Sequence, residues 1–460
     1  MALVLQAKDA VEWDYRGEGA VNLVLAYCGN SPNFVGKVLR IQKVPRNKPE
    51  NSHSALTKHE CLLWGEVEGI FSAPTREIAE QLYVQHVMRP LLGSEHVDPG
   101  ICVLVSREFL EAVERKVLRQ RPSKRVDAAK VNPLCDSVLL IADHSMFPHG
   151  TFSGYIKEDY CISVEIKVLF STSILFASRP YMFIWEENAV KRSTTRFRMH
   201  QALKLHQGEI SQISKYDPLD LFSRSKDRVR RAIRSLFITP QNNFRVFLNG
   251  GLVFGGMGDT TDSTCNGVDQ GFDDALRHII LAKDGLHQKY FVELVAEAAY
   301  RSSLLDRLLE VQKLDVVDIE GAIHAYYDIV SKPCLVCQEK DENKLSGKYS
   351  YLHSLSRDEG LKIVKNYLIS ATAKDLSMMI SFRSRENVDP DPSYRAVFLE
   401  STNQCFDYKA SFIDLDMKPL KKMEYYYELD RKIVSCYVQM EEAEKVAENG
   451  QGIKETSNSD

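Results

Sequence analysis

The sequence of 460 residues has no hydrophobic run long enough to span a lipid bilayer, and its first residues lack the basic and apolar segments of a secretory signal. A membrane-spanning protein and a secreted protein are therefore not expected, and the sequence predicts a location in the cytoplasm, the nucleus or both. At this length the chain can bury a large core and form two lobes or one elaborated domain.

A strong positive charge is also missing, since the formal net charge is −4. This balance disfavours a general nucleic-acid-binding protein, and a zinc finger that binds DNA is not expected. Two short basic clusters nevertheless stand out, at residues 115–125 and 224–234. Each is either a solvated helix face or a site for a small, dense polyanion, which needs local rather than global positive charge.

Closely spaced cysteines are rare in this sequence. Most of its ten cysteines are scattered, which is typical of reduced thiols and not of a disulfide framework. The exception is the pair Cys334 and Cys337, which lies between His324 and His353. Two thiolates and two imidazoles make a tetrahedral set that suits Zn²⁺. With four protein ligands no position stays open, so this zinc is expected to be structural. A redox role of the cysteine pair is the alternative.

The Rossmann and Walker A fingerprints are both absent. Residues 16–22 contain two glycines, but they lie between two predicted strands. Such a turn is either a plain hairpin or a glycine-rich turn that covers nucleotide phosphates, as in protein kinases. Lys37 and Arg40 on the next strand favour the second interpretation, because both lie within reach of such phosphates.

Hydrophobic periodicity and β-branched content predict a mixed α and β protein. Strands are predicted at 15–25, 34–41, 137–144, 161–170, 244–248 and 251–255. Helices are predicted at 57–70, 75–90 and 106–120, and helix is expected to dominate after residue 185. The polar segments 48–56 and 441–460 are expected to be a loop and a disordered tail.

Two aspartates lie in short runs that suit phosphoryl transfer. Asp375 follows Ala371-Thr-Ala-Lys, and Asp414 follows the strand-like Phe412-Ile and precedes Lys418. Phosphoryl transfer needs one carboxylate to hold Mg²⁺ and another to orient or deprotonate the attacking hydroxyl. A capping or turn role is the alternative for either aspartate.

Several motifs, in a fixed order along residues 8–440, resemble the inositol-pentakisphosphate 2-kinases, especially the plant enzymes. The motifs that carry this resemblance are Tyr15-Arg-Gly-Glu-Gly, Val38-Leu-Arg-Ile-Gln-Lys, Arg125-Val-Asp-Ala-Ala, Asp143-His, Thr239-Pro-Gln-Asn-Asn-Phe-Arg, Glu320-Gly-Ala-Ile-His, Thr372-Ala-Lys-Asp and Phe412-Ile-Asp. The resemblance implies a two-lobed α+β fold, distantly similar to protein kinases, with a structural zinc site in the C-terminal lobe. The implied parts are an N-terminal lobe at 1–141 with the glycine-rich turn, a hinge at 142–160, a C-terminal lobe at 161–440 and a tail at 441–460.

The same resemblance implies a kinase that transfers the γ-phosphoryl group of ATP to the 2-hydroxyl of inositol 1,3,4,5,6-pentakisphosphate, which gives inositol hexakisphosphate (phytate). The implied cofactors are ATP, Mg²⁺ and a structural Zn²⁺. The implied substrate is a small molecule, and no nucleic acid, membrane or partner chain is implied, so a monomer is expected.

Individual positions match the functional residues of that family. Asp375 matches the catalytic aspartate, which accepts the hydroxyl proton. The positions that match nucleotide-binding residues are Gly19, Ala20, Val21, Asn22, Arg40, Ala142, Asp143, His144, Glu165, Ile166, Lys167, Arg245 and Asp414, of which Asp414 also matches the Mg²⁺ ligand. The positions that match substrate-binding residues are Arg125, Lys204, Asn242, Asp375, Lys418, Lys422 and Tyr426. The positions that match the zinc ligands are His324, Cys334, Cys337 and His353.

The sequence departs from the family pattern just after Lys167. The family has Glu-x-Lys-Pro-Lys there, with its last lysine in the inositol-phosphate pocket, whereas this chain has Leu169 at that position. Such a loss removes roughly 1.5–3 kcal/mol of charged hydrogen bonding, which is about ten- to hundred-fold in binding or rate. Arg179 is a possible substitute. Two hypotheses follow: residues 168–185 come from a mis-joined exon or an alternative transcript, or the chain is a catalytically impaired inositol-phosphate-binding protein.

Two smaller departures concern single positions. Pro45 and Lys422 both stand where an arginine is usual. Arg46 can take over from the first, whereas Lys422 gives up the bidentate geometry of a guanidinium.

Overall fold

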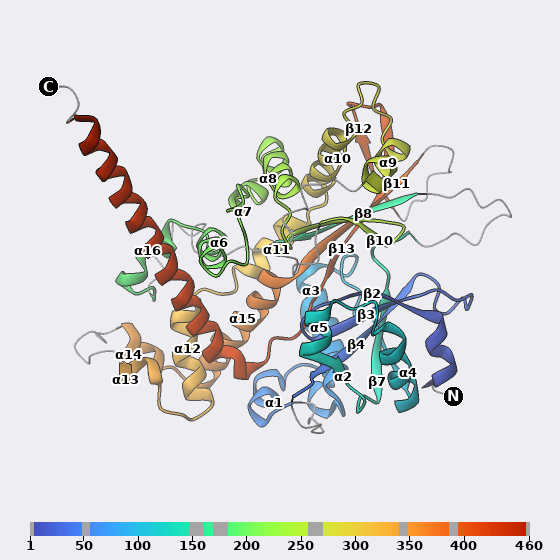
Figure 1. The fold of residues 1–460 in the computed structure, drawn as a ribbon. Helices are drawn as coiled ribbons and strands as arrows, with labels where there is room; N and C mark the ends of the chain where they lie inside the picture. Colours follow the sequence, from blue (N-terminus) through green and yellow to red (C-terminus); the bar gives the residue numbers. More distant parts are fainter. Residues whose placement is uncertain are drawn as a thin grey trace. The chain divides into compact units, whose positions relative to one another are not determined.

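The computed structural model describes residues 4–47, 56–147, 160–168, 183–255, 270–339, 348–385 and 394–456. The chain forms two compact units, and each is assembled from segments far apart in the sequence (Figure 1). Unit 1 comprises Met1–Lys167, Pro240–Arg307 and Leu376–Met417, and unit 2 comprises Val168–Thr239, Leu308–Asp375 and Lys418–Asp460. The described strands all fall in unit 1, while the described part of unit 2 is helical, so the predicted α+β class is confirmed. The predicted hinge at 142–160 falls entirely within unit 1, and its residues 148–159 lie outside the described residues.

The first sheet of unit 1 has the strand order β1-β5-β7-β4-β3-β2, with β6 paired to β4. Its strands are β1 (Val4–Leu5), β2 (Trp13–Glu18), β3 (Asn22–Tyr27), β4 (Lys37–Pro45), β5 (Ile101–Val105), β6 (Ala129–Val131) and β7 (Ser137–Ala142). Strands β2 and β3 form the predicted hairpin, in which Glu18 pairs with Leu23. The glycine-rich turn therefore lies at one end of this sheet.

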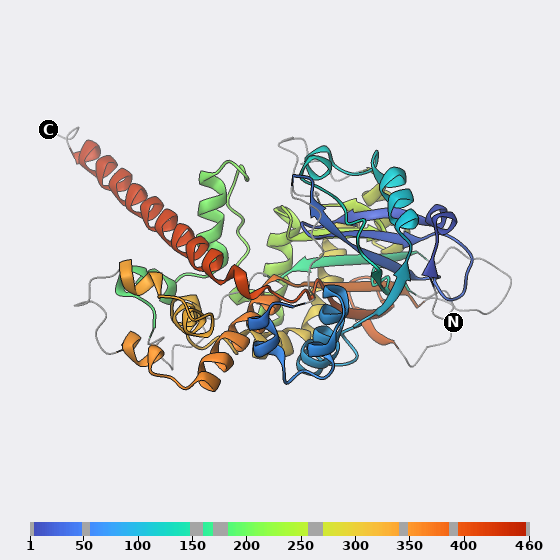
Figure 2. The same ribbon diagram turned by 90° about the horizontal axis from the view of Figure 1, so that it is seen from below.

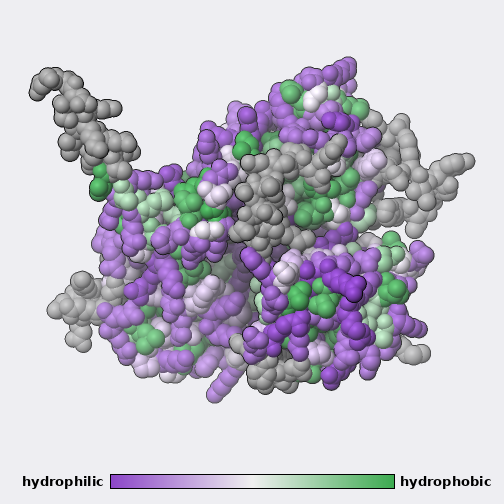
Figure 3. Space-filling model, viewed as in Figure 1, coloured by the Kyte–Doolittle hydropathy of each residue, from purple (hydrophilic) through white to green (hydrophobic). Residues whose placement is uncertain are grey.

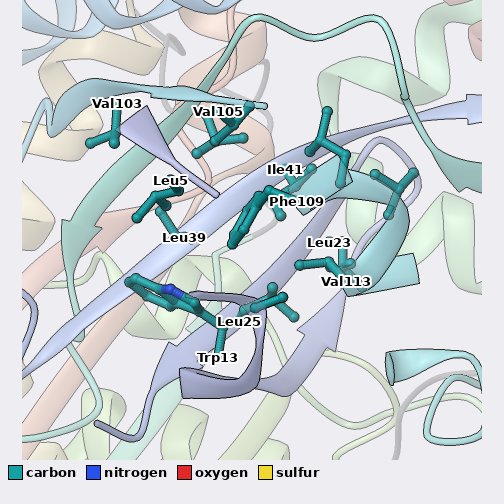
Figure 4. Close-up of a cluster of buried hydrophobic side chains, with 14 of the residues drawn as sticks. Leu5, Trp13, Leu23, Leu25, Leu39, Ile41, Val103, Val105, Phe109 and Val113 are labelled. Carbon is teal, nitrogen blue, oxygen red and sulfur yellow. The ribbon is translucent and has the colours of Figure 1, made fainter. Parts of the chain in front are cut away.

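Alternation of side chains along the central strands builds the core of this sheet (Figure 4). Leu23 and Leu25 of β3 and Leu39 and Ile41 of β4 are fully buried, because residues two apart on a strand share one face. Helix α4 (Arg107–Val117) packs Phe109 and Val113 into the same cluster. Ser106 caps that helix by accepting a hydrogen bond from the amide of Phe109.

Short helices complete the N-terminal part of unit 1. They are η1 (Ala7–Glu12), α1 (Lys58–Trp64), η2 (Ile70–Ser72), α2 (Arg76–Tyr83), the π-helix η3 (Val84–Met88), α3 (Arg89–Leu92) and α5 (Ser123–Ala128). A capping box starts α1, since Thr57 and Glu60 each accept a hydrogen bond from the other's backbone amide. The predicted helix 75–90 corresponds to α2, η3 and α3, whereas the predicted helix 57–70 is shorter, since α1 ends at Trp64, and η1 and α5 were not predicted.

The second sheet of unit 1 has the order β10-β9-β8-β11-β13-β12, and its neighbouring strands are antiparallel. Its strands are β8 (Cys161–Lys167), β9 (Phe244–Leu248), β10 (Gly251–Phe254), β11 (Ser377–Ser384), β12 (Arg395–Leu399) and β13 (Gln404–Ile413). Ser377 of β11 pairs with Lys167 on one side and with Ile413 on the other. The loop that begins at Asp414 therefore leaves the sheet close to the end of β8. Helices α9 (Gln270–Ile279) and α10 (His287–Arg301) lie beside this sheet.

Unit 2 is a set of packed helices. They are η5 (Glu186–Arg192), α6 (Arg196–His206), α7 (Pro218–Leu221), α8 (Lys226–Ile238), α12 (Asp318–Ile329), α13 (Leu335–Glu339), α14 (Lys348–His353), α15 (Arg357–Asp375), η6 (Leu420–Lys422) and α16 (Met423–Thr456), while α11 (Leu304–Gln312) crosses the boundary between the units. Met199 and Leu203 of α6 pack against Ile433 and Tyr437 of α16. Helix α12 also packs against α15 and α16, so these three helices and α6 frame the unit.

Helix α16 is the long red helix of Figures 1 and 2, and it continues to Thr456. The sequence predicts a disordered tail from Glu441 onward, so the structure differs from that prediction over residues 441–456. The run from Glu441 to Glu448 consists of Glu, Ala, Lys and Val, and most of these are strong helix formers. The polar residues of this segment therefore favour continuation of α16 and not a disordered tail.

The face of the molecule in Figure 3 is mainly hydrophilic, and its hydrophobic residues form separate patches. Among the described residues, none of the helices is both long and apolar enough to cross a membrane.

Candidate active site and metal centre

The glycine-rich turn is closed by its own backbone and is open on its outer side. The amide of Gly19 donates to the carbonyl of Asn22 at 2.9 Å, and the ammonium of Lys43 donates to the carbonyl of Gly19 at 2.7 Å. Apart from the neighbouring residues in the chain, no atom of the described residues lies within 4 Å of the place where a Cβ would stand at Gly17 or Gly19. The predicted positions Gly19, Ala20, Val21 and Asn22 thus form a turn whose backbone a ligand can approach closely.

Arg40 joins this turn to the loop after β13. Its guanidinium lies 3.0 Å from a carboxylate oxygen of Asp416 and 3.6 Å from one of Asp414. Asp416 also accepts a hydrogen bond of 3.3 Å from the side-chain amide of Asn22. The structure therefore brings together three predicted nucleotide-site residues, Arg40, Asn22 and Asp414. Asp416 was not predicted, although its place two residues after Asp414 is a signal that was available.

The backbone of Asp414 has a positive φ of 62°. That conformation is uncommon for residues other than glycine and is found more often at functional sites. The pKa of Asp414 is raised from its ordinary value by loss of water contact and by the charges of Glu165 and Asp416, while Arg40 opposes the rise. The side chain is still 47% exposed, so the nearby carboxylates of Glu165 and Asp416 contribute to this rise alongside the partial loss of water contact. A carboxylate in this setting gains from a bound cation.

Glu80 of α2 extends this acidic group. Burial and the charge of Asp416 raise the pKa of Glu80 to about 7, although Arg76 opposes the rise. The nitrogen Nε of Arg76 lies 3.0 Å from Glu80, and its NH1 lies 3.3 Å from Glu60. Glu80 was not found from the sequence, because only the fold brings α2 close to the loop after β13.

Strand β8 places Glu165 next to a second arginine. One oxygen of Glu165 lies 3.3 Å from the guanidinium of Arg245 on β9, and the other accepts a 2.8 Å hydrogen bond from Ser377. The charges of Glu165 and Lys167 both act on Asp414, so these predicted residues share its surroundings. Ile166, the position between them, is fully buried, which indicates a packing role for its side chain.

The segment after β7 is tied down by hydrogen bonds. The amide of Ala142 donates to Asp98 at 2.8 Å, and the amide of Asp143 donates to the carbonyl of Gly36 at 2.8 Å. The carboxylate of Asp143 accepts from Arg16 at 3.0 Å. Burial lowers the pKa of His144 to about 4, so this imidazole is neutral at neutral pH. The side chain of Asp143 thus has a structural role, because it binds Arg16. It lies between Ala142 and His144 and helps to fix the backbone of both.

Two predicted substrate-binding residues, Arg125 and Asn242, belong to unit 1. Arg125 lies on α5 and is half-buried. The side-chain oxygen of Asn242 is buried and has no hydrogen-bond partner among the described residues. A buried acceptor without a donor is costly, and a ligand hydroxyl would satisfy it.

The other predicted substrate-binding residues belong to unit 2. Asp375 is the last residue of α15, and the ammonium of Lys418 donates a hydrogen bond to its carboxylate. Tyr426 lies close enough for the charge of Asp375 to act on it, and burial, followed by that charge, raises the pKa of Tyr426. Lys422 is exposed in η6, and Lys204 lies on α6. The structure thus groups Asp375, Lys418 and Tyr426.

The His and Cys side chains of the predicted metal site converge, and their ligand atoms all lie within 4.8 Å of one another. The Nδ1 atom of His324 lies 3.5 Å from Sγ of Cys334, 3.4 Å from Sγ of Cys337 and 3.0 Å from Nε2 of His353. Asp328 accepts from the other ring nitrogen of His353 at 2.9 Å, which fixes the orientation of that ring. The donor set and its support fit a tetrahedral metal ion.

A second acidic group, Asp318, Glu320 and Asp430, is buried in unit 2. The ammonium of Lys191 lies among them, 2.9 Å from Glu320 and 2.8 Å from Asp430, and it also contacts Asp318. Asp318 has a positive φ of 59°. Arg196 also pairs with Asp430, so two protein cations offset these carboxylates, which indicates a structural charge cluster and not a cation site.

The sequence departures are only partly visible. Leu169 and Arg179 lie outside the described residues. At the far end of the unusual segment, Phe183 and Trp185 are buried, and the amide of Trp185 donates to Glu320 at 2.7 Å. Pro45 pairs with Ala129 of β6.

The arginine after Pro45 also has protein partners. The guanidinium of Arg46 donates to the carbonyl of Val126 and lies 3.3 Å from Glu114. Arg46 is thus already bonded to α5 and α4.

An open glycine-rich turn, basic residues and aspartates are the groups that phosphoryl-transfer enzymes use. A sequence profile described as inositol-pentakisphosphate 2-kinase matches residues 15–432. The inositol-pentakisphosphate 2-kinase of Arabidopsis thaliana is 53% identical over 97% of this chain and 98% of its own length. The enzyme of that name from Oryza sativa subsp. indica is 48% identical over 95% of this chain and 96% of its own length, and that from Danio rerio is 26% identical over 95% of each. The chain belongs to the inositol-pentakisphosphate 2-kinase family.

Proposed function

We propose that this protein transfers the γ-phosphoryl group of ATP to the 2-hydroxyl of inositol 1,3,4,5,6-pentakisphosphate and so makes inositol hexakisphosphate. The observation that carries the proposal is the family match over residues 15–432, together with a relative of that name that is 53% identical over 97% of the chain. The proposal includes a fold of two lobes, distantly similar to protein kinases, and a monomer that acts in the cytoplasm or nucleus.

The nucleotide residues of the proposal are those of unit 1. The turn Gly19–Asn22 covers the phosphates, and Arg40, Lys167 and Arg245 supply positive charge. The amides of Ala142 and Asp143 already have partners, so the proposal gives the adenine contact to the amide of His144. Asp414 would hold Mg²⁺, which neutralises charge on the transferred phosphoryl group when it is bound. The raised pKa of Asp414 supports this role, because crowding by Glu165 and Asp416 favours a nearby cation.

Asp375 is proposed as the group that acts on the substrate hydroxyl. It accepts the proton of the 2-hydroxyl while the oxygen forms a bond to the γ-phosphorus and the bond to the ADP oxygen breaks. Its position at the end of α15 and its 57% exposed side chain leave the carboxylate accessible to a ligand. Lys418 holds the carboxylate in place through their direct hydrogen bond.

The remaining basic residues are proposed to bind the substrate phosphates. A molecule with five phosphates needs several cationic and hydrogen-bonding side chains from different segments. Arg125, Lys204, Asn242, Lys418 and Lys422 supply them, with Tyr426 beside Asp375. Asn242 would contribute its side-chain NH2 group, which can donate to a phosphate oxygen.

A structural Zn²⁺ is proposed at His324, Cys334, Cys337 and His353. Two thiolates and two imidazoles at these separations match the ligand set of closed zinc sites. Four protein ligands leave no position for a reacting molecule, so the proposed metal pins α13 and α14 to α12.

The proposal is tested by incubating the purified chain with ATP, Mg²⁺ and the pentakisphosphate, and by following the hexakisphosphate by anion-exchange chromatography. Turnover by the wild-type chain and its loss in Asp375→Asn are expected. Asp358→Asn, which changes an exposed aspartate at the start of the same helix, is the matched control and keeps its activity. Equal turnover in wild type and Asp375→Asn would remove Asp375 from the mechanism. Tight binding of the pentakisphosphate without turnover would instead favour the impaired binding protein.

A further inference from the structure

Three charged residues of unit 1 form a buried network beneath the glycine-rich turn. Glu18 ends β2, Lys43 lies on β4 and Arg121 follows α4, and the side chain of each is at most 1% exposed. Arg121 donates from Nε and NH2 to the two oxygens of Glu18, at 2.9 and 3.0 Å. Lys43 donates to the same carboxylate. Charged groups so fully removed from water are rare unless each is paired in this way.

The network also holds backbone groups on both sides. Lys43 donates to the carbonyl of Gly19 in the turn at 2.7 Å. On the other side, NH2 of Arg121 donates to the carbonyl of Arg125 at 3.3 Å and to that of Ala129 at 2.9 Å. One connected set of side chains therefore reaches from the glycine-rich turn to helix α5.

Helix α5 depends on this support. It has only six residues, and no side chain caps its N-terminus. The carbonyl of Arg125 also accepts from the amide of Ala129, the first residue of β6, so the buried Arg121 adds a side-chain donor where α5 ends and β6 begins. Glu114 ties down the next strand, since it accepts from the amide of Val131 in β6 at 3.0 Å and lies 3.3 Å from Arg121.

We propose that Arg121, acting with Glu18 and Lys43, is a positioning residue that holds the backbone of Arg125 in a fixed relation to the glycine-rich turn. This inference rests on the proposed function, in which the turn binds nucleotide phosphate and Arg125 binds an inositol phosphate. One buried network then sets the geometry of both contacts in unit 1. It also explains why the basic cluster 115–125 is not simply a solvated face, because Arg121 points into the protein.

Arg121→Lys is the principal test. The new side chain keeps its charge beside Glu18, but it cannot donate at the same time to Glu18, Arg125 and Ala129. We expect the KM for the pentakisphosphate to rise about ten-fold or more, because misplacement of a positioning group has effects of this size. The KM for ATP should change less than three-fold, since Lys43 still holds the turn. In the double variant Arg121→Lys/Arg125→Ala the rise should be no greater than in Arg125→Ala alone.

The matched control is Arg383→Lys. Arg383 pairs with the buried Asp407 at 3.2 Å within the second sheet, so its change weakens a comparable buried ion pair away from the turn. It should lower the melting temperature to a similar degree, but it should not raise the KM for the pentakisphosphate more than the KM for ATP. If Arg121→Lys raises both KM values equally, or if its effect adds fully to that of Arg125→Ala, Arg121 is only structural and the inference fails.

Lys43→Gln tests the contact between the network and the glycine-rich turn, and it provides a second test if Arg121→Lys does not fold. It leaves Arg121 on Glu18 and α5 but removes an ammonium from the carbonyl of Gly19, so the KM for ATP should rise while that for the pentakisphosphate stays. Hydrogen exchange needs no turnover: amides of α5 and β6 should exchange faster in Arg121→Lys than in Arg383→Lys. If the wild-type protein is inactive but Arg121→Lys still exchanges faster than Arg383→Lys, the proposed function alone is overturned. If the wild-type protein is active but the two variants exchange at the same rate, the positioning role alone is overturned.

Discussion

The ammonium of Lys418 donates a hydrogen bond directly to the carboxylate of Asp375. The lysine side chain is 15% exposed and the aspartate side chain 57%, so the lysine is held and the carboxylate faces outward. In the proposed reaction the first residue binds a substrate phosphate and the second accepts the hydroxyl proton. Their direct contact means that loss of the lysine affects both tasks.

Lys418→Met is therefore expected to lower kcat as well as to raise the KM for the pentakisphosphate. The loss of a charged hydrogen bond suggests a decrease in kcat/KM of about ten- to hundred-fold. Steady-state kinetics with both substrates measures it. Lys421→Met is the matched control, because Lys421 is an exposed neighbour without a proposed role. A rise in KM at constant kcat would show that Lys418 does not act through Asp375.

Asp414→Asn is expected to reduce kcat/KM by about a hundred-fold or more, since it removes the proposed Mg²⁺ ligand. The concentration of Mg²⁺ needed for half-maximal activity should rise with it. Titration of activity with Mg²⁺ at saturating ATP provides the measurement. Asp136→Asn, at an exposed aspartate of unit 1, should leave the Mg²⁺ curve unchanged, and the same unchanged curve in Asp414→Asn would exclude it as a ligand.

Cys337→Ser is expected to lose bound metal and to lower the melting temperature, because binding of a structural zinc contributes directly to folding free energy. Metal content by mass spectrometry should fall from one zinc per chain to nearly none. Cys436→Ser, at a half-buried cysteine of α16, should retain the metal. Wild-type protein that is purified without zinc and melts at the same temperature after zinc is added would contradict the proposed site.

Lys191→Met is expected to destabilise unit 2 by about 3–5 kcal/mol, because it removes the cation that three buried carboxylates share and leaves only Arg196 on Asp430. Denaturant unfolding followed by circular dichroism would measure the change in free energy. Lys313→Met is the control, since Lys313 pairs with a well-exposed Glu310 and should change stability by less than about 1 kcal/mol. A similar small change in both variants would show that Asp318, Glu320 and Asp430 are not stabilised by Lys191.

Stability should fall as the pH drops from about 6.5 towards 4. Burial, followed by the charges of Lys204 and Arg196, lowers the pKa of His200 to about 4, whereas an unfolded histidine titrates near pH 6.5. Between these values the unfolded chain binds more protons than the folded chain, so acid favours unfolding by about 1.4 kcal/mol per pH unit for such a group. Melting temperatures between pH 7 and 5 should show a smaller slope in His200→Gln than in wild type. An identical slope would mean that His200 is not neutral in the fold.

Local patterns were enough to predict much of the fold. Alternation in β3 and β4 and the helical periodicity of α4 identify these elements correctly, because one face of each is buried and the other is not. Strand β11 was missed, since it is buried along most of its length and shows no alternation. One of its two neighbours in the sheet, β8, comes from a distant part of the chain, and only the assembled sheet reveals this pairing.

The candidate site shows the same limit. The metal quartet was found by ligand type and spacing, and its side chains do converge. Glu80 and Arg121 were not found, because their roles depend on contacts made by α2 and by the end of α4 after folding. A single sequence shows which residues can do chemistry, but not which buried charges support them.

Strand β8 ends at Lys167. Each of the residues of β9 and β11 that pairs with β8 lies opposite a residue between Cys161 and Lys167. An exon exchanged downstream would leave this ladder whole.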